Sequence, residues 1–270
     1  MYFDTHAHYD NPRFKADRHA VLTDLQQQGV SLVLNPGSDL ASSERAVQLA
    51  QCYPFLYAAV GVHPHEARTM GETSIAALQE FAAQPKVVAI GEIGLDYHYD
   101  HSPRDIQRTR FREQMELAKQ LGLPVIIHER EATADVMAVL RDFRGMPGVV
   151  HCFSGSVETA RQLVDWGFHL SFTGVITYKN ARHSHEALRA VPHDCVMIET
   201  DAPYLTPEPY RSKRNSSAYL VHIAAKIAEL WGTTPEEVAR ITLENGTRLF
   251  RIRQVCQTPH AHLFGKFSES

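Results

Sequence analysis

The sequence predicts a single-domain α/β protein folded as a (β/α)8 barrel, the TIM barrel, and three observations support this prediction. Eight short apolar runs alternate with helix-like segments along most of the 270 residues, and repeated βα units of this kind form parallel sheets. The chain length suits eight such units closed into a barrel better than an open doubly wound sheet. Polar residues recur where the apolar runs end, which is where active sites lie in such barrels.

The predicted elements alternate in type from one end of the chain to the other. In order, strands are predicted at Tyr2–Asp4, Ser31–Asn35, Leu56–Val62, Val87–Ile93, Pro124–His128, Val149–Phe153, His169–Phe172 and Val196–Glu199. Helices are predicted at Asp17–Gln28, Ser42–Cys52, Ser74–Ala83, Asp105–Leu121, Ala132–Phe143, Val157–Trp166, His185–Val191, Ser217–Trp231 and Pro235–Phe250. Glycine and proline mark many of the junctions between them. The segment Thr233 to Glu237 is typical of a capped helix start with proline in the first turn.

Composition and charge narrow the class of protein. A hydrophobic fraction of 44% and a charged fraction of 21% are ordinary for a globular domain with an ample core. The formal net charge of −4 argues against a strongly basic nucleic-acid binder, but it permits binding through a local basic patch and metal ions. The four cysteines show no CxxC spacing, and Cys152 and Cys195 lie in apolar strand-like runs, which indicates small, buried, reduced thiols.

Neither a secretory signal nor an apolar run of roughly 20 residues is visible, so no membrane partner is expected. We therefore expect a soluble, cytoplasmic protein, with a monomer as the default state. The barrel is predicted to occupy residues 1–252, and residues 253–270 form a tail without helical or strand periodicity.

The most informative feature is the segment Phe3-Asp4-Thr5-His6-Ala7-His8, which follows the first apolar run. In an extended strand alternate side chains point to the same face, so the imidazoles of His6 and His8 can converge on one point. Four more polar residues, Glu92, His128, His151 and Asp201, stand at or near the ends of other strand-like runs. Imidazole and carboxylate ligands suit Zn, Mn or Fe, with Mg possible where oxygen ligands dominate.

Taken singly, each of these residues has an ordinary structural explanation. His128 alone would be a hydrogen-bonded structural histidine, Glu92 a paired carboxylate and Asp201 a helix N-cap. Their joint placement at strand ends of one barrel predicts a metal centre at its carboxyl-terminal mouth.

The same segments resemble the TatD family of metal-dependent deoxyribonucleases, which are amidohydrolase-like metal barrels. The matching segments span residues 3 to about 250 and occur in the family's order. They are Phe3 to His8, Gly61-Val62-His63-Pro64-His65, Gly91 to Tyr97, Pro124 to His128, His151-Cys152-Phe153-Ser154-Gly155 and Glu199 to Leu205.

The resemblance implies a cofactor of two divalent metal ions, Mg2+, Mn2+ or Zn2+, that share Glu92 as a bridge. His6 and His8 would hold one ion, with Asp201 beside it, and His128 and His151 would hold the other. Asp201 is the expected catalytic base, which orients and deprotonates the attacking water, and Glu92 acts with it as the bridging ligand. Two metals can stabilise both the attacking and the leaving oxygens of a phosphodiester.

The implied activity is hydrolysis of DNA by a 3′–5′ exonuclease that acts on single-stranded or frayed ends. The resemblance also allows RNA ends as substrates, and DNA repair is one process in which such an enzyme would act. The alternative on the same barrel is a D-aminoacyl-tRNA deacylase or another metal-dependent ester or amide hydrolase. A metal-dependent binding or scaffold protein is the remaining reading. It is disfavoured because structural metal sites are usually closed by their ligands, whereas Asp201 is left free.

Several residues near the mouth are candidates for substrate contact. His63 and His65 follow the third strand and either bind substrate phosphate, orient a ligand or serve a structural role. Arg211 and Arg214 belong to a basic run that either follows a phosphate backbone or is a solvated face. Asp96 is expected to orient a ligating histidine, or to cap a loop. Tyrosines that could stack unpaired bases stand at 97, 99, 178, 204 and 210.

One segment departs from the family pattern. The family usually has an Asn-Glu-Pro-like sequence after the basic run, whereas this chain has Asn215-Ser216-Ser217. The acidic residue and the proline are absent, so loop geometry and substrate choice are expected to differ here from those of relatives.

Overall fold

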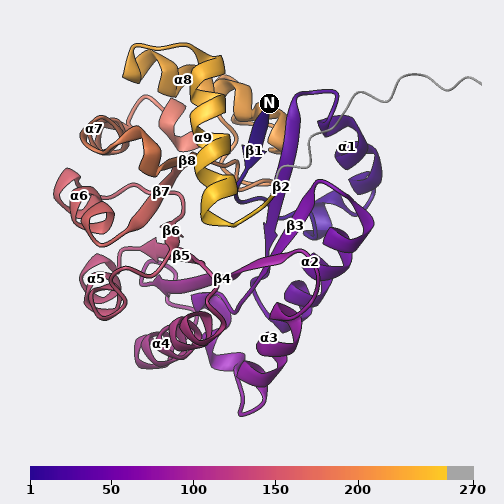
Figure 1. Cartoon of the computed structure of the whole chain (residues 1–270), viewed down its shortest axis with the longest axis vertical. Helices are drawn as coiled ribbons and strands as arrows, with labels where there is room; N and C mark the ends of the chain where they lie inside the picture. Colours follow the sequence, from indigo (N-terminus) through magenta and orange to yellow (C-terminus); the bar gives the residue numbers. More distant parts are fainter. Residues whose placement is uncertain (254–270) are drawn as a thin grey trace, which may run out of the picture.

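The computed structural model describes residues 1–253 and shows eight parallel strands arranged in sequence order around a barrel, which confirms the predicted fold class (Figure 1). All seven ladders between consecutive strands are parallel. The strands are β1 (Tyr2–Asp4), β2 (Val30–Pro36), β3 (Leu56–Val60), β4 (Val87–Asp96), β5 (Val125–Arg130), β6 (Gly148–Val150), β7 (Phe168–Phe172) and β8 (Val196–Ile198). Apart from Arg253, the predicted tail lies outside the described residues.

The ring closes between the first and last strands through the segments that follow them. The Thr5 backbone N–H donates to the Ile198 carbonyl at 3.3 Å, and the His8 N–H donates to the Ala202 carbonyl at 2.7 Å. A parallel bridge also joins Ala7 to Ala202. Because all strands run in the same direction, their carboxyl ends meet at one mouth.

Helices cover the outside of the barrel, one after each strand, and a ninth follows the eighth unit (Figure 1). They are α1 (Arg18–Leu25), α2 (Leu40–Cys52), α3 (Ser74–Ala82), α4 (Arg104–Leu121), α5 (Thr133–Asp142), α6 (Val157–Asp165), α7 (Arg182–Ala190), α8 (Leu220–Trp231) and α9 (Pro235–Leu249). In the described part of the chain, no helix combines the length and the apolar character needed to cross a membrane.

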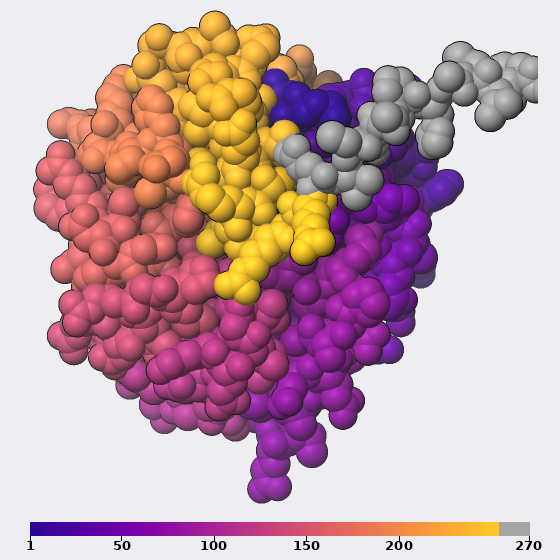
Figure 2. Space-filling model, in the orientation of Figure 1, coloured from indigo at the N-terminus to yellow at the C-terminus, as the bar shows by residue number. Residues whose placement is uncertain are grey.

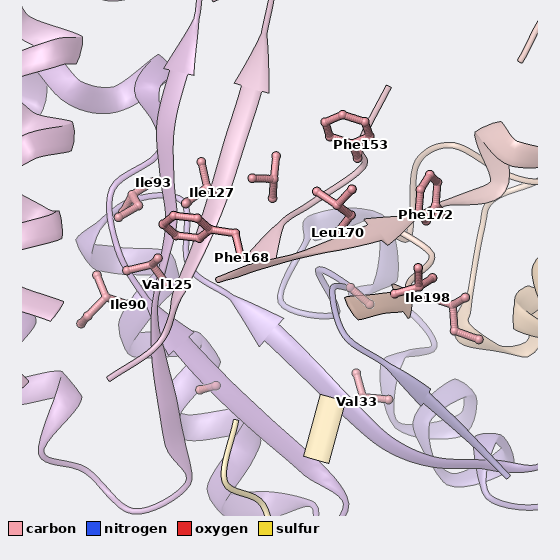
Figure 3. Packing of buried hydrophobic residues seen from close by; sticks show 14 of the residues in the cluster. Val33, Ile90, Ile93, Val125, Ile127, Phe153, Phe168, Leu170, Phe172 and Ile198 are labelled. Atoms are coloured by element: carbon pink, nitrogen blue, oxygen red, sulfur yellow. The ribbon is translucent and has the colours of Figure 1, made fainter. Parts of the chain in front are cut away.

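The core has two layers because side chains alternate along each strand. Figure 3 shows outward-facing residues of the larger cluster, such as Val125 and Ile127 on β5 and Leu170 on β7, which pack beneath the helices. Inward-facing residues form the second cluster, which includes Phe3, Leu34, Ala59, Ala89, Ile126, Val149 and Met197. This inner layer fills the barrel below the predicted site.

The end of α9 closes the amino-terminal end of the barrel. Leu249, Phe250 and Ile252 join the inner cluster, and the Phe250 ring meets Phe3 edge-on at 6.1 Å between centroids. A Cβ on Gly246 would lie 2.7 Å from a Phe3 ring carbon, so only glycine permits this approach. Figures 1 and 2 show α9 across the middle of the molecule in this view. Ligands therefore reach the interior from the opposite, carboxyl-terminal mouth.

Several predicted boundaries were wrong by a few residues. The sixth strand ends at Val150 instead of Phe153, because Cys152 adopts a left-handed backbone with φ of 48°. The fourth strand continues to Asp96, beyond the predicted end at Ile93, with its ladder to β5 maintained. The seventh helix begins at Arg182, three residues before the predicted start.

Candidate metal centre

The six predicted metal ligands meet at the carboxyl-terminal mouth of the barrel. Five of them line a cavity of about 670 Å³, and His6 lies fully buried beside them. They come from five separate strand ends: His6 and His8 after β1, Glu92 in β4, His128 in β5, His151 after β6 and Asp201 after β8. The barrel thus gathers residues that are up to 195 positions apart (201 minus 6) into one site.

One group of donor atoms surrounds Oε2 of Glu92. His6 Nε2 lies 3.3 Å from this oxygen, and His8 Nε2 lies 3.7 Å from it. The two imidazole nitrogens are 3.1 Å apart. Asp201 Oδ1 lies 3.7 Å from His6 Nε2 and 3.6 Å from His8 Nε2. Four potential ligand atoms therefore face a common point.

A second group surrounds the other oxygen of the same carboxylate, Oε1. His128 Nδ1 and His151 Nε2 each lie 2.8 Å from Glu92 Oε1, and they are 3.1 Å from one another. His63 Nε2 lies farther away, 3.5 Å from the same oxygen. Glu92 therefore directs its two oxygens toward two separate pairs of imidazoles.

These distances and donor types fit a divalent metal. A tetrahedral ion with bonds of about 2.1 Å separates neighbouring ligand atoms by about 3.4 Å, close to the spacing around Glu92 Oε2. Paired imidazole nitrogens at 3.1 Å share one proton at most, so a shared cation satisfies both lone pairs better. The rings of His6 and His151 also stack at 4.1 Å, an arrangement unfavourable for two imidazolium ions but suitable for two neutral ligands.

Carboxylates behind the histidines fix their orientation. Asp96 Oδ2 lies 3.1 Å from His128 Nε2 and 2.9 Å from His65 Nε2, as expected from the sequence. Glu199 Oε1 lies 3.2 Å from His151 Nδ1 and accepts the Cys152 N–H at 2.8 Å. In both His128 and His151 the ring nitrogen away from Glu92 meets a carboxylate, an arrangement that fixes the tautomer and makes the other nitrogen more basic.

A buried hydrogen-bond network joins the two segments that supply the first group of donors. Asp4 accepts the backbone N–H of Thr200 at 2.9 Å and that of His6 at 3.3 Å. The Ser217 hydroxyl donates to Asp4 Oδ2 at 2.6 Å, and the Ser217 N–H donates to the Tyr9 hydroxyl at 2.9 Å. A proline at position 217 lacks both donors, so this network depends on the departure from the usual family segment.

The ionisable side chains of the site shift one another's pKa values. Burial acts to raise the pKa of Glu92, but the neighbouring histidines, His151 above all, hold it well below its ordinary value. Burial alone lowers the pKa of His151, yet Glu92 and Glu199 raise it well above the ordinary value. Burial raises the pKa of Asp201, opposed mainly by His6 and His8. The carboxylates of this buried site therefore require compensating positive charge, which a divalent cation supplies.

The predicted substrate contacts occupy different places. His63 and His65 line the cavity, whereas Arg211 and Arg214 do not. Arg214 forms two hydrogen bonds with the Asp17 carboxylate, at 2.9 and 2.6 Å. The guanidinium carbon of Arg211 lies 3.8 Å from the centroid of the Tyr178 ring.

Comparison with known proteins decides the family. The model of the family described as TatD related DNase matches residues 3–251. The chain belongs to the TatD family. It is 46% identical to the uncharacterized metal-dependent hydrolase YabD of Bacillus subtilis, over 93% of this chain and 100% of that protein. It is 37% identical to the 3′-5′ ssDNA/RNA exonuclease TatD of Citrobacter koseri, over 93% and 99% of the two chains.

The crystal structure of the TatD homologue YjjV from Escherichia coli K12 has the same barrel. It matches with a TM-score of 0.88 and 33% identity, and covers 93% of this chain and 98% of that one. Together with the histidine and carboxylate clusters, these matches make the chain a TatD-family metal-dependent hydrolase.

The sequence analysis assigned no supporting role to three residues that hold the site of this TatD-family member in place: Asp4, Ser171 and Glu199, although Asp4 and Glu199 stand in the segments that resemble the family. All three are buried, and Glu199 links His151 to the Ser171 hydroxyl, which donates to Glu199 Oε2 at 2.5 Å. One signal was available, because Glu199 directly follows the apolar run Val196–Ile198. A carboxylate at the end of a buried strand needs a partner inside the fold.

Proposed function

We propose that the chain hydrolyses phosphodiester bonds at single-stranded nucleic acid ends, releasing nucleotides from the 3′ end. The main observation is that the two oxygens of Glu92 face two separate pairs of imidazoles, with Asp201 beside the first pair. These residues would hold two divalent ions, with Glu92 shared between them. Such ions, when bound, would acidify water and neutralise the charge of a phosphodiester.

Asp201 is the proposed general base. Its Oδ1 lies 3.6 Å from His8 Nε2, and its side chain, 15% exposed, lines the cavity. Its backbone N–H donates to the His6 carbonyl at 2.8 Å, which holds the segment after β8 against the segment after β1. The carboxylate would orient the attacking water and take its proton.

His63 is proposed to donate a hydrogen bond to a phosphate oxygen. Its Nδ1 accepts the His65 backbone N–H at 3.1 Å, so in the neutral ring Nε2 carries the proton. Burial lowers the pKa of His63 to about 3, which keeps the ring neutral at ordinary pH. His65, held by Asp96, would contact the same phosphate.

The basic run after β8 is proposed to contribute outside the cavity. Arg211 is exposed and is not part of an ion pair among residues 1–253, so it can contact the phosphate backbone of a longer substrate. Arg214 would act through its contact with Asp17, which holds the loop in place beside the Arg13 carbonyl.

The polarity and the substrate are supported by relatives. Proteins named 3′-5′ ssDNA/RNA exonuclease TatD, from Citrobacter koseri and Cronobacter sakazakii, are 37% and 36% identical to this chain over nearly their whole lengths. A site at a barrel mouth also admits a single-stranded end more readily than an intact duplex.

The test is hydrolysis of single-stranded DNA labelled at the 3′ or the 5′ end. Metal-stripped protein would receive Mg2+, Mn2+ or Zn2+, with Asp201→Asn as the inactive control. Metal-dependent release of the 3′ label as mononucleotides, absent in the variant, is expected. No cleavage by folded, metal-loaded protein would contradict the proposal and make a D-aminoacyl-tRNA ester the next substrate to assay.

A further inference from the structure

Two tyrosines at the mouth expose their rings to an unusual degree. Among residues 1–253, the exposed large hydrophobic side chains are Met1, Val221, Tyr99 and Tyr204. Tyr99 is 51% exposed and Tyr204 is 46% exposed, and both line the cavity that contains the predicted metal ligands. Aromatic rings ordinarily gain stability through burial, so exposed rings at a site suggest that a ligand covers them.

Each of these rings has an arginine beside it. The guanidinium carbon of Arg130 lies 4.8 Å from the Tyr99 ring centroid, and that of Arg13 lies 5.7 Å from the Tyr204 centroid. Among residues 1–253, neither Arg13 nor Arg130 takes part in an ion pair, unlike Arg214. Each ring therefore combines a large exposed aromatic surface with a neighbouring positive charge that no carboxylate of residues 1–253 neutralises.

The neighbours of each ring hold it in place. Asn11 Nδ2 donates to the Tyr204 hydroxyl at 3.0 Å. The Tyr99 ring stacks on His101 at 5.6 Å with an interplanar angle of 17°, and it meets the His65 ring edge-on at 5.4 Å. Fixed rings lose little conformational entropy when a ligand stacks on them.

The topology places the two tyrosines on opposite sides of the mouth. Tyr99 follows β4 and Tyr204 follows β8, and these strands are four apart in a ring of eight. Tyr204 is three residues beyond Asp201, and Tyr99 is three residues beyond Asp96, which orients His128. The two groups of donor atoms around Glu92 lie between them.

We propose that the two tyrosine–arginine pairs, Tyr99 with Arg130 and Tyr204 with Arg13, are stacking subsites for unpaired nucleobases. They would hold the nucleosides on either side of the scissile phosphate. This inference depends on the proposed function and specifies how that site recognises its substrate. Every base has a π face, so the subsites tolerate sequence variation, while a base inside a duplex has both faces covered and is rejected.

The first experiment measures kcat/KM on a fluorescent single-stranded DNA oligonucleotide for Tyr99→Ala, Tyr204→Ala and the matching phenylalanine variants. Each alanine variant is expected to lose roughly 5- to 150-fold, and each phenylalanine variant to remain within about threefold of wild type. Tyr57→Ala is the matched control. Tyr57 also has a cation beside its ring, because the Lys86 ammonium lies 5.1 Å from the ring centroid. It stands near the start of β3, however, at the end of the barrel opposite the mouth.

Substrates lacking one base make the test specific to stacking. We expect oligonucleotides with an abasic unit at the terminal or the penultimate 3′ position to be poorer substrates for the wild type. Each alanine variant should then lose nothing further on one of the two abasic substrates. Equal losses on intact and abasic substrates, or unchanged kcat/KM in both alanine variants, would overturn the proposal.

A binding measurement separates this inference from the proposed function. If the wild type cleaves no oligonucleotide, fluorescence anisotropy with the same intact and abasic strands still reports on the subsites. Tighter binding of the intact strand, lost in Tyr99→Ala and Tyr204→Ala but kept in the phenylalanine variants, would support stacking without hydrolysis. Equal affinity for intact and abasic strands would refute the subsites regardless of activity.

Discussion

Replacing Glu199 by glutamine tests whether the carboxylates behind the histidines tune the metal centre. Glu199 Oε1 contacts His151 Nδ1 and the Cys152 N–H, and Oε2 accepts from the Ser171 hydroxyl. Glutamine can keep its oxygen toward His151 and turn its amide toward Ser171, whose hydroxyl accepts as well as donates. The hydrogen bonds are then retained, and the main loss is the negative charge that makes His151 a stronger ligand.

The expected magnitude follows from this geometry. Loss of a carboxylate that orients a ligating histidine typically weakens metal affinity by about 10- to 100-fold, or about 1.4 to 2.7 kcal/mol. Because the number of hydrogen bonds is preserved, the unfolding free energy of the metal-free protein should change by only about 1 kcal/mol. Weaker metal binding in a protein of nearly normal stability is therefore the expected signature of Glu199→Gln.

The assay is competition between the protein and a chromophoric chelator for Zn2+, combined with urea unfolding of the metal-free form. Glu158→Gln, in the first turn of α6, is the matched control and should leave the metal affinity unchanged. Wild-type metal affinity in a folded Glu199→Gln variant would refute the role assigned to this carboxylate.

Four further perturbations have definite expected outcomes. Asp201→Asn should keep the fold and lose about 100- to 10,000-fold in kcat on single-stranded DNA, as expected for loss of a general base. Ser217→Ala should lower the unfolding free energy in urea by about 1–3 kcal/mol, because it leaves buried Asp4 and Tyr9 short of a hydrogen-bond partner. Gly94→Ala should cost more than about 3 kcal/mol or prevent soluble expression, because φ is 144° and the added Cβ would lie 2.0 Å from the His128 carbonyl oxygen. Metal removal by EDTA should lower Tm, since a cation present at 1,000 times its Kd stabilises the fold by about 4 kcal/mol.

For each of these four predictions, one experimental result would contradict the reasoning. Wild-type turnover by metal-loaded Asp201→Asn would exclude Asp201 as the base. Full stability in Ser217→Ala would show that the Asp4 network adds nothing to the fold, with exposed Thr233→Ala as a comparison for a harmless hydroxyl loss. A stable, active Gly94→Ala protein would contradict the close approach of β4 to β5. An identical Tm with and without EDTA would mean that no cation is bound at working concentrations.

The alternation of apolar runs with helical patterns predicted the barrel, and the fold then determined which residues meet. Glu92 and His128 stand 36 positions apart in the sequence, yet both were assigned to one mouth because parallel strands end at the same edge. Local sequence was less informative about where a strand stops. Cys152 leaves the strand conformation because its backbone is left-handed, with φ of 48°, and a cysteine does not signal such a turn in the sequence as a glycine would.

Contacts between distant buried polar groups could not be predicted from the sequence. Asp4 lies in the same segment as His6, but its partners Thr200 and Ser217 are 196 and 213 residues away. The run at 211–214 shows the same limit. Arg211 and Arg214 looked equivalent in the sequence, and only the position of Asp17 distinguishes the paired arginine from the unpaired one.

The most direct test of the account is a titration of metal-stripped protein with Mn2+, in which release of the 3′ label from single-stranded DNA is measured at each addition. With Glu92 bridging two ions, activity should rise until about two equivalents are bound per chain and then remain constant. Full activity at one equivalent would contradict the two-ion centre. No release at any ratio, from protein shown to be folded and metal-loaded, would contradict phosphodiester hydrolysis itself.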